Sequence, residues 1–243
     1  MRVFIFSIGV LMIKEDFLWT GGPRFLFDTE LFPPGTDSFA LGYFAAAKSG
    51  ERVCDLGSGT GLLGMLLLAR QGALHIANVE LSAAALDLAE KNFAANGWLD
   101  RASFCCGDLR DANALPAPGS IDRCISNPPY FKSGSGESSP HAERRQAREE
   151  NTCSLDDVCA AVQRILRWGG SFCLVHRPDR LVDIFCSLRA HAIEPKRVRF
   201  VLPRSDAAPS LVLIEGRRGG KPGLVFEPPL VIGSPEWDAV YFR

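Results

Sequence analysis

The chain has 243 residues, of which 47% are hydrophobic and 23% charged, and its formal net charge is −1. This composition allows one domain with a sizeable core and a modest extension, and the near-neutral charge excludes a globally basic nucleic-acid-binding protein. The eight cysteines form no C-x-x-C pair and the four histidines are scattered. We therefore expect reduced thiols, a cytoplasmic protein and no metal site.

The first residues form an unusual apolar start. Residues 3–13 resemble the core of a short signal peptide, but no small-residue cleavage site follows and the run leads directly into charged residues. The run is also too short to cross a bilayer as a helix. We expect neither secretion nor a membrane segment, and Met12 rather than Met1 as the true initiator.

The hydrophobic pattern predicts a hairpin over residues 17–32, with its turn at Gly21-Gly22-Pro23, and then an amphipathic helix over residues 35–48. Strands and helices alternate from there. The expected strands are 52–56, 75–80, 102–106, 121–127 and 171–176, and the expected helices are 62–71, 82–96, 154–168 and 180–191. Two late strands, 197–202 and 211–215, have no helix between them, which predicts an antiparallel hairpin closing a parallel sheet.

A glycine-rich turn joins the first of these alternating strands to its helix. Residues 53–61 read Val-Cys-Asp-Leu-Gly-Ser-Gly-Thr-Gly, and glycine lets the backbone pass close to a bulky ligand. Residues 59–64 also match the dinucleotide fingerprint G-x-G-x-x-G, which is a weak signal by itself. Asp55, two residues before Gly57, stands where a cationic methionine moiety needs a counter-charge, and this favours S-adenosylmethionine (SAM).

Two further acidic residues follow later strands. Glu80 ends the strand 75–80 and could accept hydrogen bonds from both ribose hydroxyls of a cofactor. Asp108 follows the strand 102–106 and could accept from the exocyclic amine of an adenine. Each residue alone is as consistent with a solvated or structural role. Their shared position at strand ends, where ligands bind in open α/β sheets, favours a common site.

The tetrapeptide Asn127-Pro128-Pro129-Tyr130 follows the apolar run 124–126. The lone pair of a planar amine is delocalised, so its attack on a methyl donor needs acceptors that align the two N–H groups. The side-chain carbonyl of Asn127 and the backbone carbonyl of Pro128 can supply these acceptors. The prolines stiffen the turn, and Tyr130 offers a flat face for stacking. The segment alone could be a rigid turn, but with the glycine-rich turn upstream it predicts N-methylation.

The glycine-rich turn and the Asn-Pro-Pro-Tyr segment together resemble the class I SAM-dependent amino-methyltransferases. Within that group the chain is most similar to the bacterial tRNA(Val) adenine-N6 methyltransferase family, from about residue 17 to the C-terminus. The stretches that carry this further similarity are Gly35-Thr36-Asp37, Phe131 with Gly134, Ala147-Arg148-Glu149-Glu150 and Pro228-Pro229-Leu230. Glu149 stands where the family more often has a histidine.

The resemblance implies a Rossmann-like α/β fold with a seven-stranded sheet and an antiparallel C-terminal hairpin. Residues 1–34 would be a small N-terminal extension and residues 35–243 the methyltransferase domain. The methyl group would pass from SAM to N6 of an adenine beside the anticodon of a tRNA, whose base must be flipped out of its stack. The cofactor would contact Asp55, Gly57, Gly59, Gly61, Glu80, Asp108, Leu109 and Asn127, and the target base would be held by Asn127, Pro128, Pro129 and Tyr130.

Other substrates remain open on the same chemistry. A release-factor glutamine presents a similar planar amine, but such enzymes carry a helical substrate domain for which the N-terminal segment has little room. A guanine N2 of ribosomal RNA and an adenine of DNA also fit. A methyltransferase-like scaffold without activity is disfavoured because both motifs are intact.

A tRNA partner requires a local basic surface on this nearly neutral chain, which we expect to act as a monomer. The candidate clusters are Arg144-Arg145 with Arg148, Lys196-Arg197 with Arg199, and Arg217-Arg218 with Lys221. Residues 133–140, rich in glycine and serine, would form a loop that closes over a bound base.

Overall fold

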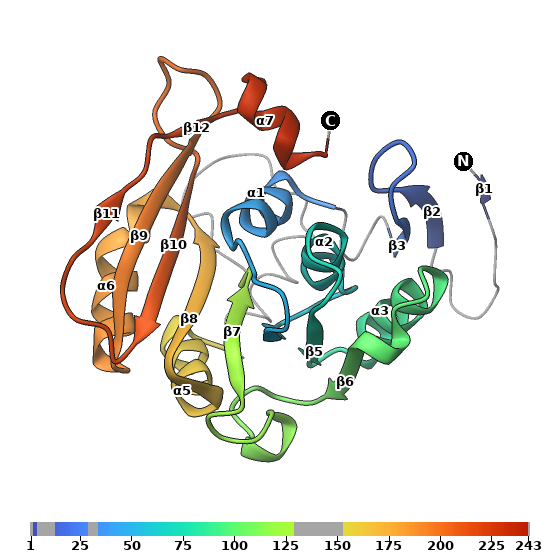
Figure 1. The fold of residues 1–243 in the computed structure, drawn as a ribbon, viewed down its shortest axis with the longest axis horizontal. Coiled ribbons are helices and arrows are strands. Elements are labelled where there is room, and N and C mark those ends of the chain that lie inside the picture. The colour runs from blue at the N-terminus through green and yellow to red at the C-terminus, as the bar shows by residue number, and fades with distance from the viewer. Residues whose placement is uncertain (1, 4–12, 29–33, 129–152, 243) are drawn as a thin grey trace, which may run out of the picture.

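The structure is a computed structural model that describes residues 2–3, 13–28, 34–128 and 153–242. Within these residues a nine-stranded sheet carries helices on both faces, and a separate three-stranded sheet lies beside helix α3 (Figure 1). The strands of the large sheet are β4 (Arg52–Leu56), β5 (His75–Glu80), β6 (Ala102–Cys106), β7 (Ile121–Ser126), β8 (Leu166–His176), β9 (Ile193–Leu202), β10 (Leu211–Arg218), β11 (Val225–Phe226) and β12 (Leu230–Val231). The helices are α1 (Thr36–Phe44), α2 (Leu62–Arg70), α3 (Ala83–Ala95), α5 (Leu155–Ile165), α6 (Leu181–Ala190) and α7 (Pro235–Val240), with short 3-10 turns η1 (Leu99–Arg101), η2 (Ala112–Ala114) and η3 (Pro178–Arg180).

The large sheet has a parallel half and an antiparallel edge. Strands β6, β5, β4, β7 and β8 lie side by side in that order and are parallel. Strand β10 then pairs antiparallel with both β8 and β9. These seven strands confirm the predicted α/β fold and its closing hairpin. The short strands β11 and β12, which were not expected, add to the outer edge of β9.

Several elements differ in length from the prediction. Helix α1 ends at Phe44 rather than near residue 48, because Ala46 adopts a positive φ of 44° that the helix cannot contain. Strand β9 begins at Ile193, before Pro195. That proline is tolerated because it lies opposite Gly216, where the ladder between β9 and β10 shifts register.

Helix α5 ends at Ile165 and strand β8 begins at the next residue, Leu166, so no loop separates them. The predicted helix extended to residue 168 and the predicted strand began at 171. At its other end the helix is as predicted, because Ser154 and Asp157 form a reciprocal capping box.

The N-terminal residues form the small sheet, with the strand order β1 (Arg2–Val3), β2 (Ile13–Phe17) and β3 (Arg24–Asp28). The predicted turn at residues 21–23 is correct and the first strand of the hairpin starts earlier than predicted, whereas the predicted end at residue 32 lies outside the described residues. Two asparagines of α3 satisfy the backbone of β3. Asn92 accepts from the Leu26 N–H at 2.6 Å and donates to its carbonyl at 3.0 Å, and Asn96 does the same at Arg24 at 2.9 and 2.8 Å.

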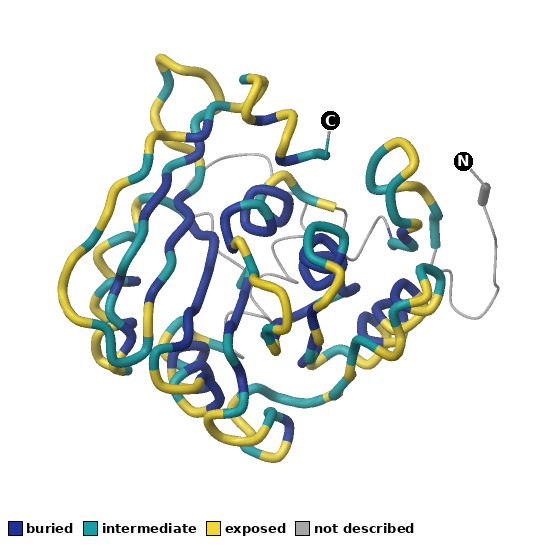
Figure 2. The backbone as a smooth tube through the Cα atoms, in the orientation of Figure 1, coloured by how far each residue is buried: buried dark blue, intermediate teal, exposed yellow. Residues whose placement is uncertain are grey.

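Each face of the large sheet has its own apolar core, and the central strands are buried along their length (Figure 2). The core under α1 and α2 includes Phe39, Leu66 and Phe93, whereas the core under α5 and α6 includes Val162 and Ile184. The connection from β6 to β7 holds only the short turn η2 and no α-helix, so this part of the second face is thinly covered.

The C-terminal residues return to the N-terminal sheet. The Phe242 ring stacks on Trp19, in the β2–β3 turn, with centroids 3.7 Å apart. The Tyr241 ring stacks on Phe39 of α1 at 4.5 Å. Arg70 at the end of α2 donates to the carbonyl of Ala239 at 3.1 Å, and its guanidinium lies 3.9 Å from the Phe242 ring centroid. No helix in the described part of the chain is long and apolar enough to cross a membrane.

Candidate active site

The candidate residues meet along one edge of the sheet. Strands β7, β4, β5 and β6 are adjacent and parallel, so their carboxyl ends lie at the same edge (Figure 1). Along this edge the sequence places Asn127 after β7, Asp55 near the end of β4, Glu80 at the end of β5 and Asp108 after β6. The four candidate residues therefore lie in a row along the ends of four adjacent strands and form one extended site.

The glycine-rich turn after β4 has the backbone geometry that only glycine adopts readily. Gly57, Gly59 and Gly61 have φ values of 74°, 54° and 81°. A Cβ at Gly61 would lie 2.9 Å from the Phe93 ring, so this position also brings α2 close to α3. Among the described residues a Cβ at Gly57 would meet nothing within 4 Å, so in this part of the structure open space borders the turn where a ligand could approach.

Asp55 lies beneath this turn with no exposed surface. Among the described residues the Asp55 carboxylate accepts no close hydrogen bond, although the Gly64 N–H acts on it and opposes the rise of its pKa, and the buried hydroxyl of Ser58 has no partner. Burial, together with the negative charge of Glu80, raises the pKa of Asp55 to about 8. The expectation that Asp55 supplies a counter-charge to a cationic ligand stays a prediction. The structure buries Asp55 completely, and its raised pKa keeps the carboxyl largely protonated below pH 8.

Glu80 links the end of β5 to the glycine-rich turn. One of its oxygens accepts from the Gly59 N–H at 2.9 Å and the other from the Ser82 N–H at 2.8 Å. These two bonds fix the carboxylate in one orientation. Each carboxylate oxygen has a second lone pair, so Glu80 can accept two further hydrogen bonds from a diol.

Asp108 is held by its neighbour Arg110. The Arg110 guanidinium binds the Asp108 carboxylate at 2.5 Å, its backbone N–H donates to it at 2.9 Å, and the side-chain bond holds the pKa of Asp108 below its usual range. Asp108 can contact an adenine amine only with lone pairs that these bonds leave open. Leu109 is half-buried and packs against the core under α5 and α6.

Asn127 follows β7, whose end is fixed by a bond from the Ser126 hydroxyl to the Leu56 carbonyl at 2.8 Å. The Asn127 amide nitrogen donates to the hydroxyl of Ser38 on α1 at 3.1 Å. This bond engages the amide nitrogen and not the carbonyl oxygen of Asn127, whose role as an acceptor for the target amine stays a prediction. Pro128 is half-buried.

Pro129 and Tyr130 lie outside the described residues, and so do Glu149, the loop 133–140 and the basic cluster of Arg144, Arg145 and Arg148.

Sequence reasoning missed two residues at this edge. Ser38 is buried and contacts Asn127, 89 positions away, so no local pattern could reveal the pair. Leu81 directly follows Glu80 and leaves 56% of its surface exposed, which is unusual for a large apolar side chain. The sequence signal that could have identified Leu81 is its position directly after Glu80, an expected cofactor ligand.

Two arginines of the predicted basic cluster around residue 197 form ion pairs within the protein. Arg197 pairs with Glu215 and Glu227, and Arg199 pairs with Glu236, so neither is available as a simple phosphate ligand. Arg218 donates to the Leu166 carbonyl. Among the described residues no group of His, Cys, Asp or Glu side chains could hold a metal ion.

The chain is similar to known methyltransferases in sequence and in structure. A family model described as the methyltransferase small domain matches residues 34–180. A protein of Dickeya chrysanthemi, named tRNA1(Val) (adenine(37)-N6)-methyltransferase, is 34% identical over 189 residues, covering 77% of this chain and 73% of its own length.

Two solved structures share the fold. A predicted O-methyltransferase of Agrobacterium tumefaciens superimposes with a TM-score of 0.71 at 19% identity, covering 85% of this chain and 96% of its own. Geranyl diphosphate C-methyltransferase of Streptomyces coelicolor, solved with S-adenosyl-L-homocysteine, has a TM-score of 0.55 at 13% identity and covers 74% of this chain and 77% of its own. Because this family model matches more than half of its residues, the chain belongs to the methyltransferase small domain family.

Proposed function

We propose that this protein transfers a methyl group from SAM to the N6 amine of an adenine in tRNA, beside the anticodon. The observation that carries the proposal is the placement of Asn127 next to the glycine-rich turn, with its carbonyl oxygen left as an acceptor by the bond to Ser38. The substrate class comes from the relatives, since the Dickeya chrysanthemi protein carries the name of a tRNA adenine-N6 methyltransferase.

The residues at the sheet edge fit SAM. Among the described residues open space borders Gly57, and the buried polar atoms of Asp55 and Ser58 lie beneath the turn. When bound, SAM supplies a methyl group on a sulfonium, which is already a good leaving group. Glu80 would hold the ribose hydroxyls and Asp108 with Leu109 would border the adenine. Asp55 would favour the cationic ligand by its charge through the backbone.

The protein's share of the chemistry is mainly orientation. Asn127 would accept one N–H of the target amine through its side-chain carbonyl, and the Pro128 carbonyl would accept the other. These bonds draw the amine hydrogens into a plane and direct the nitrogen lone pair toward the methyl donor. Pro129 would stiffen the turn and Tyr130 would stack on the flipped base.

The decisive experiment is transfer of labelled methyl from SAM to separate pools of tRNA, ribosomal RNA, DNA and release factor, followed by nucleoside analysis. We expect N6-methyladenosine in tRNA. The Asn127→Ala variant should lose about 10²- to 10³-fold in turnover, because it removes one transition-state hydrogen bond, while its affinity for SAM stays unchanged.

The outcomes separate the substrate from the site. Label on a release-factor glutamine or on a ribosomal guanine would keep the methyl transfer and replace the tRNA. Near-normal turnover of Asn127→Ala would instead reject the proposed amine site. Loss of SAM binding in this variant would show that Asn127 acts mainly on the cofactor, and would reject its proposed role on the target amine.

We further propose that residues 35–243 form the catalytic domain with residues 1–34 as an extension, and that the enzyme works as a monomer in the cytoplasm without a metal. The match of the family model from residue 34 supports the division. Activity should survive a chelator, and light scattering during gel filtration should give the mass of one chain, 26.5 kDa.

A further inference from the structure

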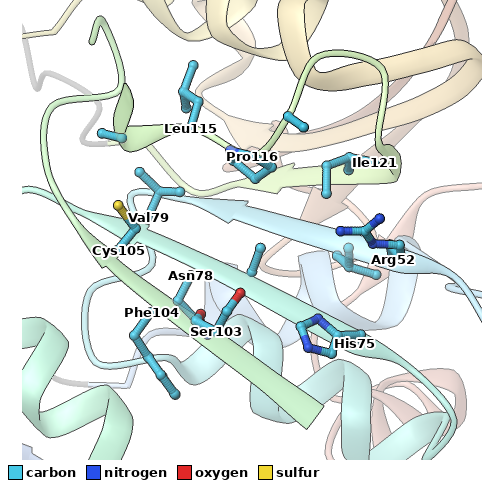
Figure 3. Close-up of a pocket in the computed structure, with 14 residues that line it drawn as sticks. Arg52, His75, Asn78, Val79, Ser103, Phe104, Cys105, Leu115, Pro116 and Ile121 are labelled. Atoms are coloured by element: carbon cyan, nitrogen blue, oxygen red, sulfur yellow. Dashed lines mark hydrogen bonds between the residues drawn. The ribbon is translucent and has the colours of Figure 1, made fainter. Parts of the chain in front are cut away.

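A pocket lies on the face of the sheet that carries α5 and α6, away from the glycine-rich turn. It has a volume of about 240 Å³ and lies between strands β4, β5 and β6 and the segment that leads from η2 to β7 (Figure 3). Its apolar wall includes Val79, Leu115, Pro116 and Ile121. Nothing in the proposed methyl transfer uses this pocket.

The register of the strands explains which side chains line it. Arg52 pairs with His75, and Ala77 pairs with Ser103. Alternate side chains of a strand face the same side, so these residues share one face of the sheet. Val79 pairs with Cys105 in the next row on that face. The floor thus changes from cationic at the start of β4 and β5 to apolar toward their ends.

The pocket exists because the connection between β6 and β7 lacks a helix. Where an α-helix would cover the sheet, the chain offers η2 (Ala112–Ala114) and the coil that follows it. The side chains that meet there are small, including Ala77, Ala114 and Ala117. The volume left open is therefore a consequence of the local backbone path.

Two acids lie near the cationic end of the pocket, and each binds another arginine. Glu51 binds Arg123 at 2.9 Å, and Asp122 binds Arg167 at 2.5 Å, although the charge of Arg52 also helps to lower the pKa of Asp122. The Asp122 carboxylate also accepts the backbone N–H of Arg52 at 2.9 Å. Among the described residues no carboxylate lies within ion-pair distance of the Arg52 guanidinium. Figure 3 shows the side chains of Arg52 and His75 at the same end of the pocket.

The size of the pocket limits its occupant. A dry protein cavity of about 150 Å³ holds benzene, whereas drug-sized ligands need about 300 Å³ or more. A pocket of about 240 Å³ therefore suits one substituted ring and is too small for SAM or for a nucleotide within RNA.

We propose that this pocket binds a small aryl anion, with its ring between Val79, Leu115 and Ile121 and its phosphate or carboxylate on Arg52. His75 contributes a second donor to the same group. Arg52 and His75 begin β4 and β5, whereas Gly57 follows β4 and Glu80 ends β5, so the anionic group of the ligand and SAM lie toward opposite ends of these strands.

Cys105 gives a direct test, because its partly exposed thiol lines the pocket. The rate of its alkylation by iodoacetamide is followed by mass spectrometry of its peptide, with phenyl phosphate as the probe. The exposed Cys186 on α6 is an internal control in the same sample. Phenyl phosphate should slow alkylation of Cys105 about tenfold at ten times its dissociation constant and leave Cys186 unchanged.

Matched probes and variants establish both parts of the ligand. Phenol and inorganic phosphate should each protect Cys105 far less than phenyl phosphate at equal concentration. Arg52→Gln should weaken protection about 10- to 100-fold, because it removes a charge-assisted hydrogen bond from an exposed position that folding does not need. Arg204→Gln, an exposed cation in the β9–β10 loop at the other end of the sheet, should have no effect.

The proposal is overturned if phenyl phosphate leaves the alkylation rate of Cys105 unchanged up to saturation, or if Arg52→Gln keeps full protection. Equal protection by phenol would reject the role of Arg52, and equal slowing at Cys186 would reject the pocket as the place of binding.

Discussion

Ser38 is the described side chain that holds the Asn127 amide. It is buried on α1, and its hydroxyl accepts from the Asn127 amide nitrogen at 3.1 Å. We predict that Ser38→Ala lowers kcat for methyl transfer about tenfold, because the Asn127 carbonyl loses its fixed direction, an effect worth about 1.4 kcal/mol. The KM for SAM should not change, and steady-state kinetics with saturating tRNA measures both constants.

The conservative variant separates positioning from packing. Ser38→Cys keeps the size of the side chain but weakens the hydrogen bond, so its kcat should lie between those of the wild type and Ser38→Ala. A Ser38→Ala enzyme with unchanged kcat, or with a raised KM for SAM alone, would show that Ser38 does not position Asn127.

Asp55 is a fully buried residue of the candidate site, and burial is the main cause of its raised pKa. Its pKa is raised to about 8, so between pH 4 and pH 8 the folded protein binds a proton that the unfolded chain has released. Stability therefore falls as pH rises through this window. We predict that the free energy of unfolding of the wild type, relative to Asp55→Asn, falls by about 1.4 kcal/mol per pH unit there, as measured by urea unfolding at pH 5, 6 and 7.

The same proton links Asp55 to the cofactor. A cationic ligand above the turn favours the ionised carboxyl, so the affinity for SAM should rise as pH increases toward 8. Asp55→Asn should lose this part of the pH dependence while retaining the part due to titration of SAM itself. Parallel pH profiles of the two proteins in calorimetry would show that Asp55 has no such influence.

The sequence was sufficient to predict the strand-end positions of Asp55, Glu80 and Asn127, because strand ends can be read from apolar runs. The sequence was not sufficient to predict which side chains form ion pairs or hydrogen bonds with one another. The pairing of Arg197 with Glu215 and Glu227, which removes a predicted phosphate site, joins residues 18 and 30 positions apart. Such pairings depend on strand order and register, which no local pattern specifies.

Helix α3 supports the small sheet through Asn92, a fully buried side chain. Its amide forms hydrogen bonds with the N–H and the carbonyl of Leu26, and it also donates to the Thr60 carbonyl in the glycine-rich turn at 3.0 Å. We predict that Asn92→Ala lowers the free energy of unfolding by about 3 kcal/mol, because it leaves buried backbone groups without partners. Urea unfolding measures the change.

Asn96→Ala is the matched control, since Asn96 makes the equivalent bonds to Arg24 at the exposed end of β3. Water can replace its amide there, so the loss should be about 1 kcal/mol. Equal effects of the two variants would contradict a special role for the buried asparagine.

At the level of elements, periodicity predicted which segments form helices and strands better than where they end. The predicted helix 154–168 overran because Leu166 continues the apolar pattern of α5 although it already belongs to β8. Strand β9 was predicted too short because Pro195 normally marks a strand end, and only the register shift at Gly216 makes it acceptable.

The two ends of the chain are joined by aromatic contacts. Phe242 stacks on Trp19 and lies under the Arg70 guanidinium. We predict that Phe242→Ala lowers the free energy of local opening of the β2–β3 hairpin by about 1 to 2 kcal/mol, because an aromatic pair and a cation–π contact are lost. Hydrogen exchange should become faster in β2 and β3 and stay unchanged in β4 and β7.

Phe226→Ala provides the control for this prediction. Phe226 lies in the short edge strand β11 with 62% of its surface exposed, so its truncation should leave the hairpin unaffected. Equal exchange in the hairpin for Phe242→Ala and the wild type would mean that α3 alone holds the small sheet.

For the molecule as a whole, the alternation of strands and helices was enough to predict the seven-stranded sheet and its C-terminal hairpin, because right-handed crossovers leave few other arrangements. The N-terminal hairpin was predicted, but the added strand β1 and the contact of the hairpin with Phe242 were not. That contact brings together segments from opposite ends of the chain, and no periodic signal marks such contacts.

The stacking of Phe242 on Trp19 also has a consequence for biosynthesis. Trp19 is synthesised long before Phe242, so the hairpin emerges from the ribosome before its aromatic partner does. The hairpin acquires this contact only once Phe242 has also emerged. A nascent chain stalled before Phe242 should therefore carry a β2–β3 hairpin that is cleaved by protease faster than in the same chain with Phe242.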